Sequence, residues 1–152
     1  MRMLPMFTLR KSMTVETGDV LLNAYTAGCR NYHGHSLTIT VELMGNTLNT
    51  DGMLVDFKKL KEGMIEHIHN PLDHKFVCPT EYSSAVVANC PPVCAGSFLV
   101  VDWNPTSENM AKWIFDNMAK WIVSEPDLVS RGVSLNSVTV QETDGNEARY
   151  FG

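Results

Sequence analysis

The sequence predicts an α+β fold, in which two helices pack on one face of an antiparallel β-sheet. Three observations lead to this prediction. Apolar and polar residues alternate near both ends of the chain, as they do in half-buried strands. The middle of the chain instead contains two segments with the spacing of amphipathic helices. At 152 residues the chain is long enough to bury a hydrophobic core, and we expect a single domain over residues 1–152.

The first half of the chain contributes two strands and one helix to this prediction. Asp56 can cap the N-terminus of the helix, and the apolar residues from Phe57 to Ile68 follow the helical period. Asn70-Pro71 ends it. In order, we expect a strand over residues 7–16, a loop over 20–28, a strand over 36–44, a turn over 45–52 and a helix from residue 57 to Asn70-Pro71.

The second half contributes a helix between further strands. Residues 104–108, Asn-Pro-Thr-Ser-Glu, are typical of a helix start, because hydroxyl and acidic groups favour the N-terminal end of the helix dipole. Segment 78–96 has no pattern that assigns it. In order, we expect a strand over 97–102, a helix from 104–108 to Ile122, a strand over 137–143, a hairpin turn at Asp144-Gly145 and a strand over 147–151. A sheet this small leaves edges and one face to be covered, usually by oligomerisation.

Composition and charge exclude several classes of function. The chain has 12 Lys and Arg against 17 Asp and Glu, and its net charge of −5 argues against a general nucleic-acid binder. No apolar run approaches the roughly 20 residues of a membrane span, and no leader peptide is recognisable. We therefore expect a cytoplasmic protein without membrane or nucleic-acid partners, whose four cysteines are reduced thiols. A small phosphorylated substrate stays compatible, since it needs only a few local cations.

The stretch from Cys29 to His35, Cys-Arg-Asn-Tyr-His-Gly-His, is the strongest candidate for a functional site. It runs into the second predicted strand, and His33 and His35 point to the same face if that strand begins early enough. Two imidazoles on one face can share a metal ion. The alternative is a pair of partly buried, hydrogen-bonded histidines. Cys29 can lie beside such a metal without binding it, or simply fill core space.

Several separated motifs occur in one order along the chain. They are Cys29-x3-His33-Gly-His35, Gly52-Met-Leu-Val-Asp56-Phe57-x2-Leu60-Lys61, Leu72-Asp73-His74, Asn104-Pro-Thr-Ser-Glu108-Asn109 and Gln141-Glu142-Thr143. Together they resemble the 6-pyruvoyltetrahydropterin synthase superfamily from about Phe7 to Tyr150. The three-residue gap after Cys29 is similar to the bacterial branch, the 6-carboxytetrahydropterin synthases of queuosine and 7-deazaguanine biosynthesis. The pyruvoyl-forming branch has a longer gap.

This resemblance implies a fold, an assembly and an activity. The fold would be a tunnelling fold, in which subunits close into barrels. The assembly would be a homohexamer with active sites at subunit interfaces. The activity would be a zinc-dependent lyase reaction on 7,8-dihydroneopterin triphosphate, which releases triphosphate and, in the bacterial branch, acetaldehyde and yields 6-carboxy-5,6,7,8-tetrahydropterin.

The resemblance also implies roles for individual residues, each of which has a simpler alternative. By position, His33 and His35 would be Zn²⁺ ligands, and Cys29 would be the general acid/base. Asp73 and His74 would be the partners of Cys29, supplied by another subunit. Glu142 would anchor the pterin ring, with Thr106 and Glu108 close to the ring pocket. The alternatives are a turn with a surface histidine at Asp73-His74, an exposed strand residue at Glu142, and helix capping at Thr106 and Glu108.

The chain departs from the family pattern at one position. The family supplies a third zinc histidine at the end of the first strand, in a Phe-x-Ala-Ala-His pattern, and alignment of residues 13–19 with that pattern puts Asp19 at the histidine position. Aspartate is an acceptable zinc ligand, and two histidines with one carboxylate also suit Fe(II) or Mn(II). We therefore expect a metal site formed by His33, His35 and Asp19. Two alternative functions stay open. The protein could form 6-pyruvoyltetrahydropterin, or it could be a homologue that binds pterin without catalysis.

Overall fold

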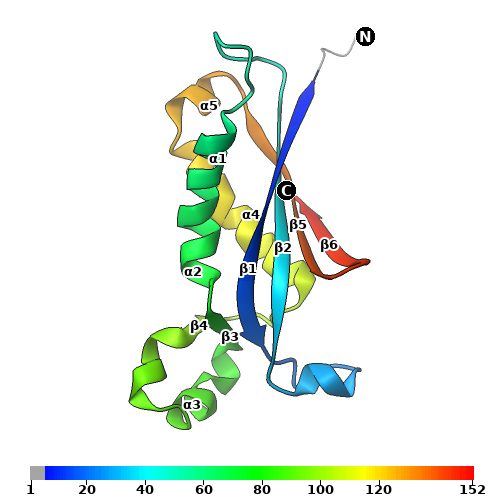
Figure 1. Cartoon of the computed structure of the whole chain (residues 1–152), viewed down its shortest axis with the longest axis vertical. Coiled ribbons are helices and arrows are strands. Elements are labelled where there is room, and N and C mark those ends of the chain that lie inside the picture. The colour runs from blue at the N-terminus through cyan, green and yellow to red at the C-terminus, as the bar shows by residue number, and fades with distance from the viewer. Residues whose placement is uncertain (1–5) are drawn as a thin grey trace.

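The computed structural model describes residues 6–152 as a six-stranded sheet that curls into a half-barrel, with helices on one face (Figure 1). Residues 1–5 of the expected domain lie outside the described residues. The strands lie in the order β4-β3-β1-β2-β5-β6. Their bounds are Phe7–Asp19 for β1, His33–Gly45 for β2, Lys75–Pro79 for β3, Phe98–Val101 for β4, Ser134–Thr143 for β5 and Asn146–Phe151 for β6.

The strands β1 and β2 form a long antiparallel hairpin through the centre of the molecule (Figure 1). Both extend further toward their connecting loop than the sequence predicted. β1 continues past Glu16 to Asp19, and β2 begins at His33, directly opposite Asp19. Gly18 and Gly34 face each other in this extension. The pairing of the two strands carries the β conformation through these positions, beyond the local alternation of apolar residues.

The sheet is mixed, which corrects the fully antiparallel sheet expected from the sequence. β1, β2, β5 and β6 pair antiparallel as predicted. β3, however, pairs parallel with β1, and β4 pairs parallel with β3. Parallel neighbours need a crossover connection. The segment without a sequence pattern supplies it, because α3 (Thr80–Ala88) and a 3₁₀ turn (Pro92–Ser97) connect β3 to β4.

Helical segments cover one face of the sheet. α1 (Phe57–Met64) continues through a π-helical turn (Ile65–His69) into α2 (Asn70–Leu72), so the helix includes Pro71 instead of stopping before it. Pro71 has no N–H to continue the helical hydrogen bonds, and the helix ends one residue later, at Leu72. α4 (Ser107–Val123) and the unpredicted α5 (Pro126–Ser130) follow later in the chain. No helix within residues 6–152 combines the length and hydropathy needed to cross a membrane.

The hydrophobic core lies between these helices and the sheet. Residues alternate along each strand, so one side of β2 and β5 is apolar and packs against α1 and α4. Gly63 lets α1 approach α4 closely, because a Cβ atom at this position would lie 2.4 Å from Trp121 Cε2. The opposite side of the hairpin is polar, with the hydroxyls of Ser12 and Thr40 hydrogen-bonded at 2.7 Å.

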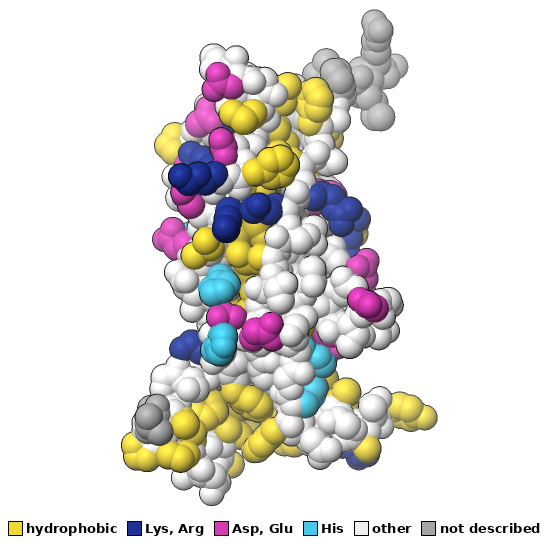
Figure 2. Space-filling view, in the orientation of Figure 1, with side chains coloured by type: hydrophobic (Ala, Val, Ile, Leu, Met, Phe, Trp, Pro, Cys, Tyr) yellow, Lys and Arg dark blue, Asp and Glu magenta, His cyan; other side chains and the backbone are white. Residues whose placement is uncertain are grey.

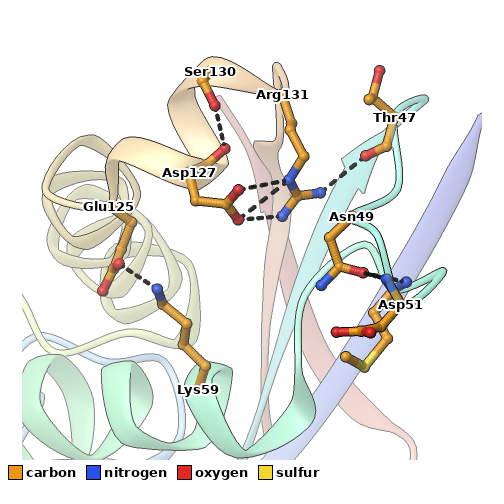
Figure 3. Close-up of polar contacts among 9 residues, drawn as sticks. Thr47, Asn49, Asp51, Lys59, Glu125, Asp127, Ser130 and Arg131 are labelled. Carbon is orange, nitrogen blue, oxygen red and sulfur yellow. Dashed lines mark hydrogen bonds and ion pairs between the residues drawn. The ribbon is translucent and has the colours of Figure 1, made fainter.

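Polar contacts tie the helices to the end of the hairpin that is remote from Asp19 (Figure 3). The Arg131 guanidinium donates to both carboxylate oxygens of Asp127 and, from Nη1, to the Thr47 carbonyl at 3.0 Å. Lys59 in α1 pairs with Glu125 at 2.6 Å. These contacts connect the loop after β2 to the end of α5, and α1 to the short link between α4 and α5.

Candidate metal centre and its surroundings

Three potential metal ligands meet where the β1–β2 hairpin ends. Asp19 closes β1 and lies opposite His33, while Thr17 lies opposite His35. Alternate residues of a strand share a face, so Asp19, His33 and His35 project to the same side as core residues of both strands, such as Leu37. Asp19 is only 4% exposed, and both histidines are half-buried. The structure thus brings together the three residues expected to bind the metal.

The distances within this group suit a shared cation. Asp19 Oδ1 lies 3.5 Å from His33 Nε2, and Oδ2 lies 3.9 Å from His35 Nε2. One donor atom from each of the three residues lies within 4.8 Å of the others, and no other His, Cys, Asp and Glu side chains in residues 6–152 come together in this way. Donors at about 2.1 Å from one ion lie roughly 3–3.5 Å apart, so small side-chain rotations suffice.

The surroundings of His33 leave its metal-facing nitrogen available. His33 Nδ1 lies 2.8 Å from the carbonyl oxygen of Asn31. A carbonyl can only accept, so this contact assigns the ring proton to Nδ1 and leaves the Nε2 lone pair directed at Asp19. Such a hydrogen bond from the second ring nitrogen is the usual support of a metal-binding histidine. The residues present therefore fit a divalent metal ion.

The charged groups around Asp19 also favour a bound cation. Burial raises the pKa of its carboxyl above the ordinary value of 3.8. Nearby His33 and His35 oppose this effect, whereas the Glu142 carboxylate adds to it. A buried carboxylate beside a second acid needs positive charge to stay ionised. A divalent cation between Asp19 and the two imidazoles would supply that charge.

The expected pterin-binding residues lie next to this group, with one exception. Asp19, Thr106 and Glu142 line one small recess beneath the N-terminus of α4. The Thr106 hydroxyl also accepts a hydrogen bond from the N–H of Asn109 at 3.3 Å. Thr106 therefore caps the N-terminus of α4, which is the simpler role given for it in the sequence analysis. Glu108 is exposed in the first turn of α4 and does not line the recess.

Asp73 and His74 form a second polar group, where β3 joins the edge of β1. His74 Nδ1 lies 2.7 Å from Asp73 Oδ2, and Asp73 Oδ1 accepts the N–H of Glu16 at 3.0 Å. The His74 N–H donates to the Glu16 carbonyl at 2.7 Å, and His74 takes a left-handed φ of 56° that non-glycine residues seldom adopt. The Glu16 N–H, and then His74, lower the pKa of the Asp73 carboxyl below 3.8. Asp73 is therefore an ionised partner for an exposed imidazole.

A further histidine belongs to this second group and was missed from the sequence. His69 Nε2 lies 3.6 Å from Asp73 Oδ2. The signal that could have found it is the four-residue spacing of His69 and Asp73, because residues four apart meet on the surface of a helix.

Cys29 lies in the loop that connects β1 to β2, within a 3₁₀ turn over Ala27–Arg30. The Leu21 N–H donates to the Cys29 carbonyl at 2.8 Å, which folds this loop back on itself. The thiol is half-buried and free, and it is not part of the group of potential metal ligands.

The metal-ligand group and the Asp73–His74 pair remain separate within one chain. No hydrogen bond or ion pair joins them in the part of the chain that the structure describes. Both border the same open hollow of about 480 Å³, whose lining includes His35, His74 and Lys75. In Figure 2 the visible histidines likewise form separate groups, with other side chains and backbone between them.

Comparison with known proteins gives consistent results over nearly the whole chain. The family model described as 6-pyruvoyl tetrahydropterin synthase matches residues 8–152. The 6-carboxy-5,6,7,8-tetrahydropterin synthase of Haemophilus influenzae is 24% identical over 149 residues, which are 95% of this chain and 99% of the relative. The Synechocystis enzyme of the same name is 30% identical over 151 residues, 96% and 94% of the two chains. The human 6-pyruvoyl tetrahydrobiopterin synthase is 32% identical over 123 residues, 80% and 68% of the two chains.

Solved structures show the same fold. A Plasmodium vivax 6-pyruvoyltetrahydropterin synthase variant superposes with a TM-score of 0.72 at 20% identity, covering 96% of this chain and 97% of its own. A protein from Wolinella succinogenes superposes with a TM-score of 0.76 at 22% identity, covering 97% and 99%.

Proposed function

The chain belongs to the 6-pyruvoyl tetrahydropterin synthase family, and from that premise we propose that it is a zinc-dependent lyase. Its substrate is 7,8-dihydroneopterin triphosphate, and its products are 6-carboxy-5,6,7,8-tetrahydropterin, acetaldehyde and triphosphate. The relatives that carry the 6-carboxytetrahydropterin synthase name over almost their full length support this choice of product.

One observation carries the proposal. A buried carboxylate and two histidines, Asp19, His33 and His35, meet at the end of the hairpin, and Asp19 shares a small recess with Glu142 and Thr106. A metal ion held there lies next to a carboxylate that can accept the paired N–H groups of a 2-aminopterin ring. A lyase acting on the pterin side chain requires a metal-binding group next to the residue that anchors the ring, and Asp19 and Glu142 are neighbours of this kind.

The side chains of the protein divide the chemistry among them. Asp19, His33 and His35 hold the zinc, which when bound supplies Lewis acidity toward the side-chain hydroxyls of the substrate. Glu142 orients the ring. Cys29 Sγ, as a thiolate, accepts a proton from the substrate side chain and returns it at a later step.

The Asp73–His74 pair supports the thiol. The ionised Asp73 carboxylate faces His74 Nδ1 and so favours the tautomer in which His74 Nε2 can accept a proton. No hydrogen bond or ion pair joins this pair to the metal ligands within residues 6–152 of one chain, which is compatible with an assembly in which a neighbouring subunit of a homohexamer completes each site.

Product analysis tests the proposal. Zinc-supplemented protein is incubated with 7,8-dihydroneopterin triphosphate, and the products are identified by mass spectrometry, with Cys29→Ala as the variant and Cys94→Ala as the matched control. We expect 6-carboxytetrahydropterin and acetaldehyde from the parent protein and from Cys94→Ala. Cys29→Ala should be slower by about 100-fold or more. A Cys29→Ala protein as fast as the parent would remove the thiol from the mechanism.

The human relative provides the second candidate, since its name assigns it to the pyruvoyl-forming branch and its identity to this chain is 32%. A 6-pyruvoyl product in the same experiment would keep the metal and the thiol in their roles and change only the branch. Absence of any product, with the pterin still bound, would instead identify a binding protein.

A further inference from the structure

A third side chain reaches the Asp73–His74 pair. His69 Nε2 lies 3.6 Å from Asp73 Oδ2, the same oxygen that faces His74 Nδ1 at 2.7 Å. The other oxygen, Oδ1, accepts the N–H of Glu16. Asp73 is therefore surrounded by two imidazoles and one backbone N–H, and its side chain is only 19% exposed.

The local backbone explains how His69 comes to face Asp73. The π-helical turn Ile65–His69 separates α1 from α2, and the N–H of Asp73 then donates to the His69 carbonyl at 2.7 Å. Residues four apart lie on one helix face, so the two side chains meet, while Ile68 and Leu72 of the same segment are buried in the core. Turns of this kind are rare, and they occur frequently at functional sites.

We infer that His69 is a positioning residue for the Asp73–His74 pair. Its imidazole holds Oδ2 of Asp73 toward the helical side while the Glu16 N–H holds Oδ1. The carboxylate then stays oriented and ionised opposite His74, whose proton is kept on Nδ1 and whose Nε2 stays free as an acceptor. His69 acts through Asp73 and does not touch the substrate.

The charges around Asp73 agree with this role. The pKa of Asp73 is lowered mainly by the Glu16 N–H and by His74, and positive charge on His69 lowers it further. The remaining charged groups nearby are engaged elsewhere. The Glu16 carboxylate accepts the Ser36 hydroxyl at 2.6 Å, and the Lys75 ammonium donates to the Gly96 carbonyl.

The chain offers a matched control in the same turn. His67 lies 4.0 Å from the Glu66 carboxylate and makes no ion pair with Asp73 in residues 6–152. His69→Gln and His67→Gln therefore make the same chemical change on the same π-helical turn, and only the first removes a neighbour of Asp73.

Long-range ¹H–¹⁵N correlation spectra of ¹⁵N-histidine-labelled protein test the inference directly, because the chain has only five histidines. The spectra show, for each ring, which nitrogen carries the proton. We expect His74 to carry it on Nδ1 in the parent protein and in His67→Gln, and to shift toward a mixture of both tautomers in His69→Gln. His69→Asn serves as a second variant where His69→Gln does not fold. A His74 spectrum identical to that of the parent in a folded His69 variant would overturn the inference.

A kinetic measurement adds a second readout, and only this part rests on the proposed function. With 7,8-dihydroneopterin triphosphate, His69→Gln should lower kcat several-fold and leave KM unchanged, because the substrate does not touch His69. A higher KM with unchanged kcat would assign His69 to binding and overturn the positioning role. If the parent protein does not turn over this substrate, only the proposed function is contradicted. The NMR measurement of the His74 tautomer does not need the substrate, and it still decides whether His69 positions the pair.

Discussion

Asp19 is the residue at which the candidate metal centre departs from the family pattern. Asp19→Asn keeps the size of the side chain and removes the charge that two imidazoles and a cation would share. We expect the affinity for zinc to fall by on the order of 100-fold, or roughly 3 kcal/mol, because a neutral amide oxygen replaces an anionic ligand in a buried site. Isothermal titration with zinc, together with the metal content of the purified protein, measures the change.

Two variants sharpen this prediction. Glu16→Gln alters an acid only three positions away, whose side chain bonds Ser36 instead of the histidines, so its zinc affinity should equal that of the parent. Asp19→His supplies another good ligand and should retain zinc. If Asp19→Asn bound zinc as tightly as the parent, Asp19 would not be a ligand.

The sequence predicted some of the residues that lie together in the candidate sites and missed others. His33 and His35 could be placed together from their spacing alone, because strand geometry fixes which residues share a face. Asp19 required the family alignment, since its pairing with His33 depends on a hairpin register that no local pattern sets. His69 was not assigned to Asp73, because the sequence placed the end of the helix at Asn70-Pro71, whereas the helical segment continues to Leu72 and keeps the four-residue spacing of His69 and Asp73.

At the scale of elements, the contact of α1 with α4 depends on Gly63. Gly63→Ala would place a Cβ atom 2.4 Å from Trp121 Cε2, and the buried indole ring cannot move without displacing other core side chains. We expect a loss of stability of about 1–3 kcal/mol, measured by denaturant unfolding. Gly28→Ala is the matched control, because no atom lies within 4 Å of its added methyl group. Equal stability of the two variants would contradict tight packing at Gly63.

The ion pair at the far end of the hairpin makes a pH-dependent contribution (Figure 3). Hydrogen bonds from Arg131 lower the pKa of Asp127 below its ordinary value of 3.8. A carboxyl whose pKa is lower in the folded state stabilises the protein above the unfolded value and loses this contribution as the pH falls through the folded value. Asp127→Asn should therefore lower Tm at pH 7, and the difference from the parent should disappear as the pH falls below 3.8.

Asp51→Asn is the control for this measurement, because Asp51 lies at the same end of the molecule and its carboxylate accepts no hydrogen bond within residues 6–152. Its Tm should follow that of the parent at every pH. A Tm difference for Asp127→Asn that is constant with pH would mean that the carboxylate charge is not the cause.

The elements that the sequence predicted well are those with a strong local signal. The hairpin β1–β2, the helices α1 and α4 and the final hairpin all follow from periodicity and capping residues. The strand expected over residues 97–102 is confirmed as β4, but β3 was not predicted. The parallel pairing of these two strands was not predicted either, because it depends on a crossover through segment 80–97 and not on any alternation of residues. Tertiary contacts decide such strands, and propensity does not.

At the scale of the whole molecule, the sheet leaves two kinds of surface uncovered. β4 and β6 are its edge strands, and the hydroxyl-bearing side of the β1–β2 hairpin faces away from the helices. Open edges are normally paired or covered. No local sequence pattern sets how copies assemble, so the homohexamer rests on family resemblance. Light scattering that gives six times the 17.0 kDa of one chain would agree with it.

Mixing variants tests whether one active site draws on two subunits. Cys29→Ala and His74→Ala are each expected to be inactive alone. If Cys29 and His74 of one site come from different chains, random co-assembly of the two variants leaves about a quarter of the sites with both groups intact. Activity on 7,8-dihydroneopterin triphosphate should then recover to about that fraction of the parent value. The His74 side chain is 80% exposed, so its removal leaves no cavity in the core.

A second mixture separates true complementation from general stabilisation by co-assembly. Asp73→Asn and His74→Ala damage the same pair, and Asp73 and His74 always come from one chain. Every site in that mixture is defective whichever subunit supplies the pair, so no activity should return. If instead the mixture of Cys29→Ala with His74→Ala also stays inactive while both assemble normally, each chain completes its own site. The open hollow that His35 and His74 share within one chain would then be where the pair and the metal meet.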